Sequence, residues 1–443
     1  MTPARGGRRR RLGKPGQTEV PAPPSAGRPA RPLSRRRRFW FRLTTICLSL
    51  LVLWGIPEAV VRLADPQLES FRGMLIGGDP NSPVLFMKEA RLHWKLRPSV
   101  ETKFLNTTVR TNRHGFRGAE PRLADKVALC LGDSTVFGYS VEESDAFPAQ
   151  LQSRLRKQSK PDDAWSVINA GVPGYSSLQV RLQAEKLVPR WKPAVIILCV
   201  GNNEAWPVQR SDREIDEDRA VSARLVSLLS ASKLLVWAAE KIRPERPQPF
   251  IAPDLERAVP RVSKEEFGEN LRAIAEIARE ANARLIFLGP PANLYWAPMR
   301  FKKFAGWEKW QAFSVQISRL VASGELQAAR EKVDAALAES PDAVAALWLK
   351  GKLLTVTGDV AGGREFLEQA IERHPFPENC KPSYRDIVAR IAREERLSHI
   401  DVNELFRQQA PGPTPEPLYL DWCHPTPQGH GIIASALAEL IGG

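Results

Sequence analysis

Two different spacings of apolar residues alternate along the chain from Lys126 onward. Short apolar runs occupy 127–132, 166–169, 194–200, 284–289 and 399–402. Stretches with apolar residues at helical spacing lie among them, at 147–156, 178–191, 264–281, 384–394 and 429–441. Uninterrupted apolar strands separated by helices are typical of a parallel sheet covered on both faces. The pattern therefore predicts a doubly wound α/β domain.

An apolar segment of another kind precedes this domain. From Phe39 to Ile56 the sequence reads FWFRLTTICLSLLVLWGI, with Arg42 as its single charged residue. A membrane-spanning helix needs about 17–25 residues, so we expect a transmembrane helix over 39–61. A buried globular helix and a cleaved signal peptide are the alternatives. Against cleavage, no clear A-x-A site follows, and the segment continues into Pro57 and Glu58.

The formal net charge of +14 suggests nucleic-acid binding until it is located. The first 42 residues hold 13 Lys/Arg and one Glu, so they carry +12, and the rest of the chain is nearly neutral. We interpret residues 1–38 as a disordered basic tail, because they have too few apolar side chains to offset the entropy of ordering. An RNA-binding arm is the alternative, but the apolar segment that follows argues against it, and we expect no nucleic-acid partner.

The basic cluster Arg35–Arg38 also predicts an orientation in the membrane. Because positive charge is retained on the cytoplasmic side, the amino terminus would be cytoplasmic. The residues after about 60 would then lie on the opposite side of the membrane. We therefore expect a single-pass protein of the inner membrane. Its α/β domain would be periplasmic or otherwise extracytoplasmic.

Two further segments complete the organisation. Residues 62–125 form a lead-in of short extended pieces, followed by the α/β domain in two parts, 126–313 and 376–443. Between these parts, residues 314–375 repeat with a period of 34, the period of the tetratricopeptide helix pair. The matching pairs are Gly324 and Gly358, Ala336 and Ala370, and Pro341 and Pro375. This insertion either binds a protein partner or substrate, or is a structural element that shapes the rim of a pocket.

Candidate chemistry begins at the end of the first strand. Gly132-Asp133-Ser134 follows that strand directly. Ligands of open parallel sheets bind beyond the carboxyl ends of the strands, so Ser134 is well placed to be a nucleophile. Read as a lone tripeptide, the same residues are an ordinary turn.

A serine nucleophile needs a base, and the chain has six histidines. His424 lies in a polar, proline-rich loop that opens the last helix, and Asp421 stands three residues before it. We expect Asp421 to orient the imidazole of His424, and His430 to be a packing or surface residue. A metal site formed by Asp421, His424 and His430 is the alternative, but the prolines break the regular spacing of a helical metal site.

Two other strand ends offer hydrogen-bond donors for an oxyanion, each worth about 3–4 kcal/mol in such sites. One is the turn from Ala170 to Ser177, whose glycines bring backbone N–H groups toward the cleft. The other is Gly201-Asn202-Asn203-Glu204, where a side-chain amide can donate.

Taken in order, these blocks resemble those of the SGNH (GDSL-type) hydrolase superfamily over residues 126–443, outside the insertion. The resemblance implies a flavodoxin-like three-layer α/β/α fold and no cofactor or metal. It implies a catalytic triad of Ser134, Asp421 and His424, and an oxyanion hole formed by the N–H groups of Ser134 and Gly174 and the side chain of Asn203. Glu204 departs from the family, which usually has Asp there.

The resemblance also implies a function. The chain would be an esterase that acts on a carboxylic or O-acetyl ester of an envelope or exported substrate, such as an acylated carbohydrate or lipid. An O-acyltransferase on an exported polysaccharide and a non-catalytic repeat scaffold are the alternatives. The membrane anchor, the lead-in block Asn112–Arg117 and the helical repeats resemble a bacterial membrane-anchored subgroup of the superfamily.

Cysteines and tryptophans leave two questions open. Cys130 and Cys199 lie in apolar strand patterns and are expected to be buried thiols, whereas Cys380 and Cys423 lie in polar loops where a disulfide is one alternative. The following tryptophans either line a sugar or acyl site or pack the insertion: Trp206, Trp296, Trp307 and Trp310.

Overall fold

The computed structural model divides into two units, 1–59 and 60–443, which are described separately. The structure describes residues 34–64, 82–89, 91–122, 125–158, 164–217, 232–242, 257–297, 307–410, 412 and 414–442. Residues 1–33 of the expected tail (1–38) and part of the lead-in, 65–81, lie outside the described residues.

One continuous helix runs from Arg35 to Ala64, and it is long and apolar enough to cross a membrane. It consists of α1 (Arg35–Leu50), a π-helical turn (Leu51–Gly55) and α2 (Ile56–Ala64). The π-helical turn stands just before Pro57, which has no N–H to donate. Most side chains of the apolar segment are exposed along this helix, as lipid contact requires.

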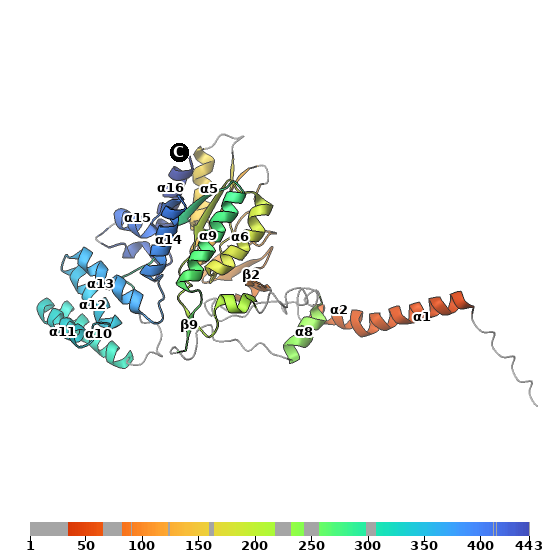
Figure 1. The fold of residues 1–443 in the computed structure, drawn as a ribbon, viewed down its shortest axis with the longest axis horizontal. Helices are drawn as coiled ribbons and strands as arrows, with labels where there is room; N and C mark the ends of the chain where they lie inside the picture. The colour runs from red at the N-terminus through yellow and green to blue at the C-terminus, as the bar shows by residue number, and fades with distance from the viewer. Residues whose placement is uncertain are drawn as a thin grey trace, which may run out of the picture. The chain divides into compact units, whose positions relative to one another are not determined.

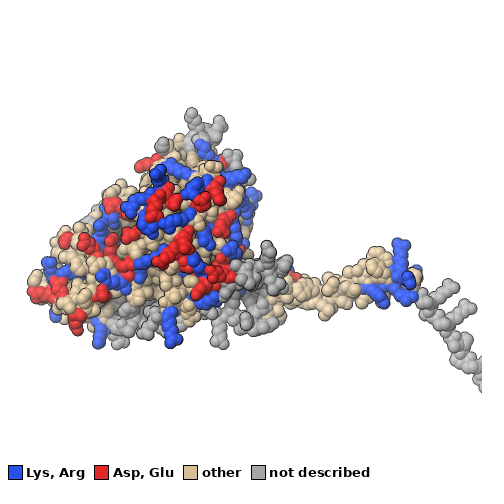
Figure 2. All heavy atoms as spheres, in the orientation of Figure 1, with Lys and Arg blue, Asp and Glu red and all other residues tan. Residues whose placement is uncertain are grey.

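The helix begins earlier than expected, and this corrects the prediction that Arg35–Arg38 belong to a disordered tail. Ser34 is the N-cap, and its hydroxyl accepts the N–H of Arg37 at 3.4 Å. Arginine is also a good helix former, so the basic cluster extends the helix. Figure 2 shows basic side chains gathered at this end, whereas both signs are interspersed over the visible face of residues 60–443.

The second unit is built on a five-stranded parallel sheet in the order β11-β10-β7-β5-β6. The strands are β5 (Lys126–Gly132), β6 (Trp165–Asn169), β7 (Val195–Cys199), β10 (Arg284–Leu288) and β11 (Ser398–Ile400). In chain order this is the 2-1-3-4-5 arrangement of flavodoxin-like folds. The expected strands and the expected fold class are confirmed.

Successive side chains of each strand enter two different cores. In β5, Leu129 and Leu131 belong to one core, and Ala128 and Cys130 belong to the other. Helices cover both faces, as Figure 1 shows. The first core is covered by α6 (Ser177–Trp191), α9 (Lys264–Glu280) and α14 (Pro382–Glu394), and the second by α5 (Phe147–Gln158), α15 (Val402–Gln409) and α16 (Pro427–Gly442).

The described part of the lead-in is built into the first core. It forms α3 (Ser82–Leu85) and two antiparallel hairpins, β1 (Phe86–Glu89) with β2 (His93–Leu96), and β3 (Glu101–Phe104) with β4 (Thr107–Arg110). Trp94 and Phe104 are almost fully buried there. The short extended pieces expected from the sequence therefore pack against the domain. A third, smaller hairpin pairs β8 (Pro207–Val208) with β9 (Val259–Pro260), and α8 (Lys233–Ile242) precedes β9.

The helical insertion consists of two antiparallel helix pairs. They are α10 (Trp307–Ala322) with α11 (Leu326–Glu339), and α12 (Val344–Val356) with α13 (Val360–Arg373). Gly324 and Gly358, 34 positions apart, both have positive φ angles at the turn inside each pair, a conformation that favours glycine. At Gly351 an added Cβ would lie 2.7 Å from the backbone oxygen of Gly363, so the helices of the second pair approach closely.

Candidate active site

The carboxyl ends of three neighbouring strands lie in register at one edge of the sheet. Gly132 of β5 pairs with Cys199 of β7, and Cys130 of β5 pairs with Asn169 of β6. The three loops that follow these strands therefore leave the sheet side by side. They carry Ser134, Gly174 and Asn203.

Ser134 is the first residue of α4 (Ser134–Phe137) and is 8% exposed. Gly132 has a φ angle of 156°, and a Cβ there would lie 2.0 Å from the carbonyl oxygen of Cys199, so this turn requires glycine. The carboxylate of Asp133 caps α4 by accepting the N–H of Thr135 at 2.8 Å. Burial raises the pKa of Asp133.

The structure brings Ser134, His424 and Asp421 together. The Nε2 atom of His424 lies 2.7 Å from Ser134 Oγ, and its Nδ1 atom lies 2.7 Å from Asp421 Oδ2. Oδ1 of Asp421 accepts the backbone N–H groups of Cys423 and His424. Burial raises the pKa of Asp421, but the charge of His424 and these hydrogen bonds lower it further, and the result lies below the ordinary value.

These contacts determine which ring nitrogen of His424 carries the proton. An ionised carboxylate only accepts hydrogen bonds, so Nδ1 donates to Asp421. Nε2 is then the acceptor that faces the hydroxyl of Ser134. This is the arrangement that a general base requires.

Two aromatic rings that the motif analysis did not connect with the site pack against His424. Tyr139 stacks on the imidazole with ring centroids 4.3 Å apart, and Trp422 meets it edge-on at 5.8 Å. Gly138, in the left-handed region at φ 85°, ends α4 and turns the chain so that Tyr139 can reach back. The sequence contains no motif that marks Tyr139, because its role depends on this turn.

The expected oxyanion donors adjoin one another. The Nδ2 group of Asn203 donates to the carbonyl of Tyr175 at 2.9 Å, directly after Gly174, and lies 3.5 Å from Asp133 Oδ2, beside Ser134. Asn203 is 5% exposed, and Gly174 has a φ angle of 80°. The three donor-bearing loops are thus in contact in the folded chain.

A buried ion pair supports the Gly174 turn, and sequence reasoning missed it. Arg261 is 1% exposed and donates through Nε to both carboxylate oxygens of Asp212 at 2.9 Å. Its Nη1 group donates to the carbonyl of Gly174 at 2.5 Å, and Asp212 also accepts the hydroxyl of Ser176. The guanidinium therefore connects a distant segment to the expected oxyanion turn. Breaking such a buried pair typically costs about 3–5 kcal/mol.

Glu204, the residue that departs from the family pattern, joins two of the loops. It is fully buried, and its carboxylate oxygens accept the N–H of Ser177 at 2.7 Å and the N–H of Asn203 at 3.0 Å. Burial raises the pKa of Glu204 to about 7 against the opposing effect of these hydrogen bonds. The longer side chain thus supports the loop that carries Asn203.

The lead-in block Asn112–Arg117 supports the nucleophile helix from its other end. Arg117 is buried, and its guanidinium donates to the carbonyl oxygens of Phe137, Gly138 and Val141 at 2.5–2.9 Å. Burial lowers its pKa to about 10. The arginine therefore satisfies the carbonyl groups at the end of α4 and beyond it.

The remaining candidate residues, two cysteines and a histidine, are buried in the structure. Cys380 and Cys423 are both free and buried, so the open question of a disulfide is answered in the negative. His430 is fully buried, accepts the N–H of Phe147 and stacks on that ring, apart from the pair that His424 forms with Asp421. Asp421, Cys423 and His424 offer atoms within 4.8 Å of one another, but Asp421 and His424 use theirs in the hydrogen bonds described above.

The tryptophans divide between packing and the site. Trp310 meets Trp348 in the helical insertion, and Trp206 lies against Phe376. Trp296 instead is 37% exposed and lies 6.4 Å from Trp422, ring centre to ring centre. The side chain of Trp307 lies outside the described residues.

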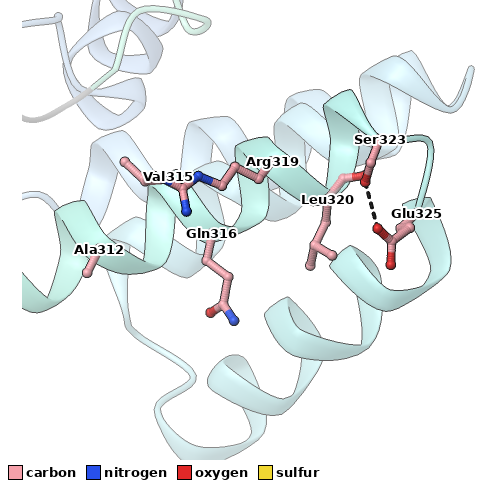
Figure 3. A pocket seen from close by; sticks show the side chains of 7 residues that line it. All are labelled: Ala312, Val315, Gln316, Arg319, Leu320, Ser323 and Glu325. Carbon is pink, nitrogen blue, oxygen red and sulfur yellow. Dashed lines mark hydrogen bonds between the residues drawn. The ribbon is translucent and has the colours of Figure 1, made fainter.

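Figure 3 shows a surface groove in a different part of the chain. It has a volume of about 380 Å³ and lies along α10 and the turn after it. Its lining residues are Ala312, Val315, Gln316, Arg319, Leu320, Ser323 and Glu325. All of them belong to the helical insertion, so this groove is separate from the loops around Ser134.

Two family models match the chain. Residues 130–339 match the GDSL-like Lipase/Acylhydrolase family, a range that includes Ser134, Gly174 and Asn203 and ends before Asp421. Residues 320–391 match the tetratricopeptide repeat, which confirms the repeat inferred from the period of 34. No curated protein matches the chain.

Several solved structures are similar at low identity. Axe2, an acetylxylan esterase from Geobacillus stearothermophilus, is 13% identical, with 72% of this chain and 94% of that chain covered and a TM-score of 0.36. LAE5, an alpha/beta hydrolase enzyme from the metagenome of Lake Arreo in Spain, gives the same identity and coverage and a TM-score of 0.35. TesA is 12% identical, with 72% and 100% covered and a TM-score of 0.34.

Glu204→Gln should remove a pH dependence of stability between about pH 5 and 7. Glu204 titrates near 7 when folded and near its ordinary value of 4.5 when unfolded, so the folded chain holds the extra proton in this window. The free energy of unfolding then falls as the pH rises, by about 3 kcal/mol in total. Urea unfolding of the full chain at pH 5, 6, 7 and 8 measures this slope.

The matched control is Glu331→Gln on the exposed side of α11, which should keep the wild-type slope. Parallel curves for wild type and Glu204→Gln would mean that Glu204 is ionised throughout, and the interpretation of its burial would be wrong.

Proposed function

Because residues 130–339 belong to the GDSL-like lipase/acylhydrolase family, we propose that the chain hydrolyses carboxylic esters through an acyl-enzyme on Ser134. One observation carries this proposal, the continuous series of 2.7 Å contacts from Ser134 Oγ through His424 to Asp421. A serine hydroxyl is a nucleophile at neutral pH only when a base accepts its proton. The arrangement supports that role for His424.

In the acylation step, Ser134 Oγ attacks the carbonyl carbon of the ester while its proton moves to His424 Nε2. An O–C bond forms, and the carbonyl electron pair moves onto the oxygen. His424 then gives the proton to the alcohol as the C–O bond to it breaks, which leaves the acyl group on Ser134. Asp421 stabilises the charged imidazole through Nδ1.

In the deacylation step the same groups act on water. His424 removes a proton from the water as it attacks the acyl carbon, and then returns that proton to Ser134 Oγ. The carboxylic acid leaves, and the site is restored. A sugar hydroxyl in place of water would give acyl transfer with the same residues.

The oxyanion of each step would be held by the N–H groups of Ser134 and Gly174 and by Nδ2 of Asn203. The contact of Asn203 with the turn of Gly174 supports this assignment, as does the buried hydrogen bonding of Arg261 and Glu204 to the same loops. Rigid donors lower the barrier because they need no reorganisation as charge develops.

For the substrate we propose an ester carried by a carbohydrate of the envelope or of an exported polymer. Trp296 supports this choice, because it presents an exposed ring beside Trp422, which itself contacts His424. Exposed tryptophan rings at a site provide a flat apolar surface with a polar edge. Such a surface matches the face of a sugar ring.

The helix Arg35–Ala64 supports an extracytoplasmic location for this reaction. Arg35–Arg38 would remain in the cytoplasm, where positively charged residues next to a membrane helix are retained. The second unit would then lie on the extracytoplasmic side of the inner membrane, with access to envelope or exported esters.

Ser134→Ala should abolish esterase activity. Without Oγ no acyl-enzyme forms, and loss of the nucleophile in serine hydrolases costs on the order of 10⁵-fold or more in kcat. Hydrolysis of p-nitrophenyl acetate and labelling by a fluorophosphonate probe, followed by peptide mapping, measure the effect. A protein that keeps wild-type hydrolysis after Ser134→Ala, or wild type labelled elsewhere, would refute the assignment.

Asn203→Ala should lower kcat by about 10²–10³-fold with little change in KM, because an oxyanion donor acts mainly in the transition state. Asn203→Asp has the same shape but no N–H group, so it should be at least as damaging. Steady-state kinetics with p-nitrophenyl acetate test both. Full activity of Asn203→Asp would exclude the amide as a donor.

Trp296→Ala should lower kcat/KM on acetylated oligosaccharides about tenfold, mainly through KM, because a lost ring contact is worth about 1.4 kcal/mol. Hydrolysis of p-nitrophenyl acetate should change much less. Trp237→Ala is the control, since Trp237 on α8 is similarly exposed at 39%. Equal losses on both substrates, or no loss on the sugar, would contradict a carbohydrate-binding role.

A further inference from the structure

The loop after β10 contacts the catalytic loop, residues 421–424, through Asn293, which is buried at 2% exposure. Its backbone N–H donates to the carbonyl of Trp422 at 2.8 Å, and its Nδ2 group donates to the carbonyl of Asp421 at 3.0 Å. Both acceptors lie within three residues of His424. Asn293 therefore fixes the backbone of the loop that carries the side chains of Asp421 and His424.

The amide of Asn293 is itself fixed on its other side. Its side-chain Oδ1 atom accepts the N–H of Tyr295 at 3.2 Å. The backbone carbonyl of Asn293 accepts Nδ2 of Asn379 at 3.1 Å. Because Oδ1 faces a donor and Nδ2 faces an acceptor, the reversed amide would oppose like groups on both sides. The side chain thus has a single orientation that satisfies its surroundings.

The residues that follow Asn293 pack into the helical insertion. Leu294 and Tyr295 are both 6% exposed and share an apolar cluster with Leu367 and Ile371 of α13. In addition, Nε1 of Trp348 on α12 donates to the carbonyl of Leu294 at 3.3 Å. The short segment 293–295 is therefore held by the repeat helices on one side and holds the catalytic loop on the other.

We propose that Asn293 is a positioning residue for Asp421 and His424, and that α12 and α13 stabilise it through Leu294 and Tyr295. This inference rests on the proposed function of the triad. It assigns the second repeat a role in hydrolysis that requires no bound partner. Misplacement of a catalytic group by about 1 Å can cost on the order of 10²-fold in rate, so a small shift of this loop is enough to matter.

Two variants of Asn293 test the hydrogen bond to Asp421. Asn293→Asp keeps an acceptor for Tyr295 but turns an oxygen toward the carbonyl of Asp421, and Asn293→Ala removes both contacts. Each should lower kcat about 10- to 100-fold with KM for p-nitrophenyl acetate within about threefold of wild type. The rate of fluorophosphonate labelling of Ser134 should fall in parallel. All rates are expressed per site titrated by complete labelling, so unfolded protein is not counted.

Two leucine variants of the insertion test the role of the repeat helices. Leu367→Ala removes packing from the cluster that contains Leu294 and Tyr295. Leu353→Ala makes the same chemical change in the separate cluster formed with α10 and α11. Both should lower the Tm, because each opens a cavity. Only Leu367→Ala should lower kcat per titrated site, by about fivefold or more.

The outcomes separate this inference from the proposed function. If the wild-type chain is not labelled at Ser134, the proposed function fails. If wild type is labelled and active but Asn293→Asp keeps its kcat and labelling rate, the positioning role is wrong. If Leu353→Ala and Leu367→Ala lower kcat per titrated site equally, the effect is general loosening of the insertion, and the assigned path through Leu294 and Tyr295 is overturned.

Discussion

The geometry of the candidate active site depends on one hydrogen bond between side chains 290 positions apart in the sequence, the 2.7 Å contact between Ser134 Oγ and His424 Nε2. The strand order places the two residues of this contact after strands that are not neighbours in the sheet. Ser134 follows β5, whereas the loop of His424 comes after β11, and β7 and β10 lie between these two strands. The connection after β11 must therefore return along the edge of the sheet before α16 packs against α5. A loop of that length has many conformations, and the contact persists only if other groups restrict it.

Buried polar groups restrict each loop at this edge, and each does so by satisfying backbone atoms. Arg117 donates hydrogen bonds to the carbonyl groups at the end of α4, and Arg261 donates one to the carbonyl of Gly174. Glu204 accepts hydrogen bonds from the N–H groups of Ser177 and Asn203. Placing such groups in the interior carries a large desolvation cost, visible in the raised pKa of Glu204 and the lowered pKa of Arg117. Apolar packing would avoid that cost, but it would leave the same backbone groups unpaired, which is also unfavourable. These buried groups therefore fix the positions of the loops at the cost of their own desolvation.

The difference between local sequence signals and long-range contacts explains what could be predicted from the sequence. The strands and their parallel arrangement follow from apolar periodicity, which is a local signal. The meeting of Ser134, Asp421 and His424 is expected from the resemblance of the short motifs around these residues to those of the SGNH hydrolase superfamily. Arg261 and Asn293 could not be predicted, because their partners lie far away in the sequence and their own neighbourhoods carry no motif. Tyr139 follows the nucleophile motif, but its contact with His424 depends on the turn at Gly138. The error at Arg35–Arg38 has a different origin. Charge density suggested disorder, but Ser34 and the helix propensity of arginine extend the apolar helix through the cluster.

The place of the helical insertion follows from the same geometry. The chain leaves β10 close to the returning catalytic loop, where Asn293 contacts Asp421 and Trp422. A short connection would leave Asn293 supported from one side only. The repeats supply a second surface, because the α13 residues Leu367 and Ile371 complete the apolar cluster around Leu294 and Tyr295. A helix pair of this kind needs neighbours to bury its faces. The segment 293–295 provides one, so the insertion and the catalytic loop stabilise each other.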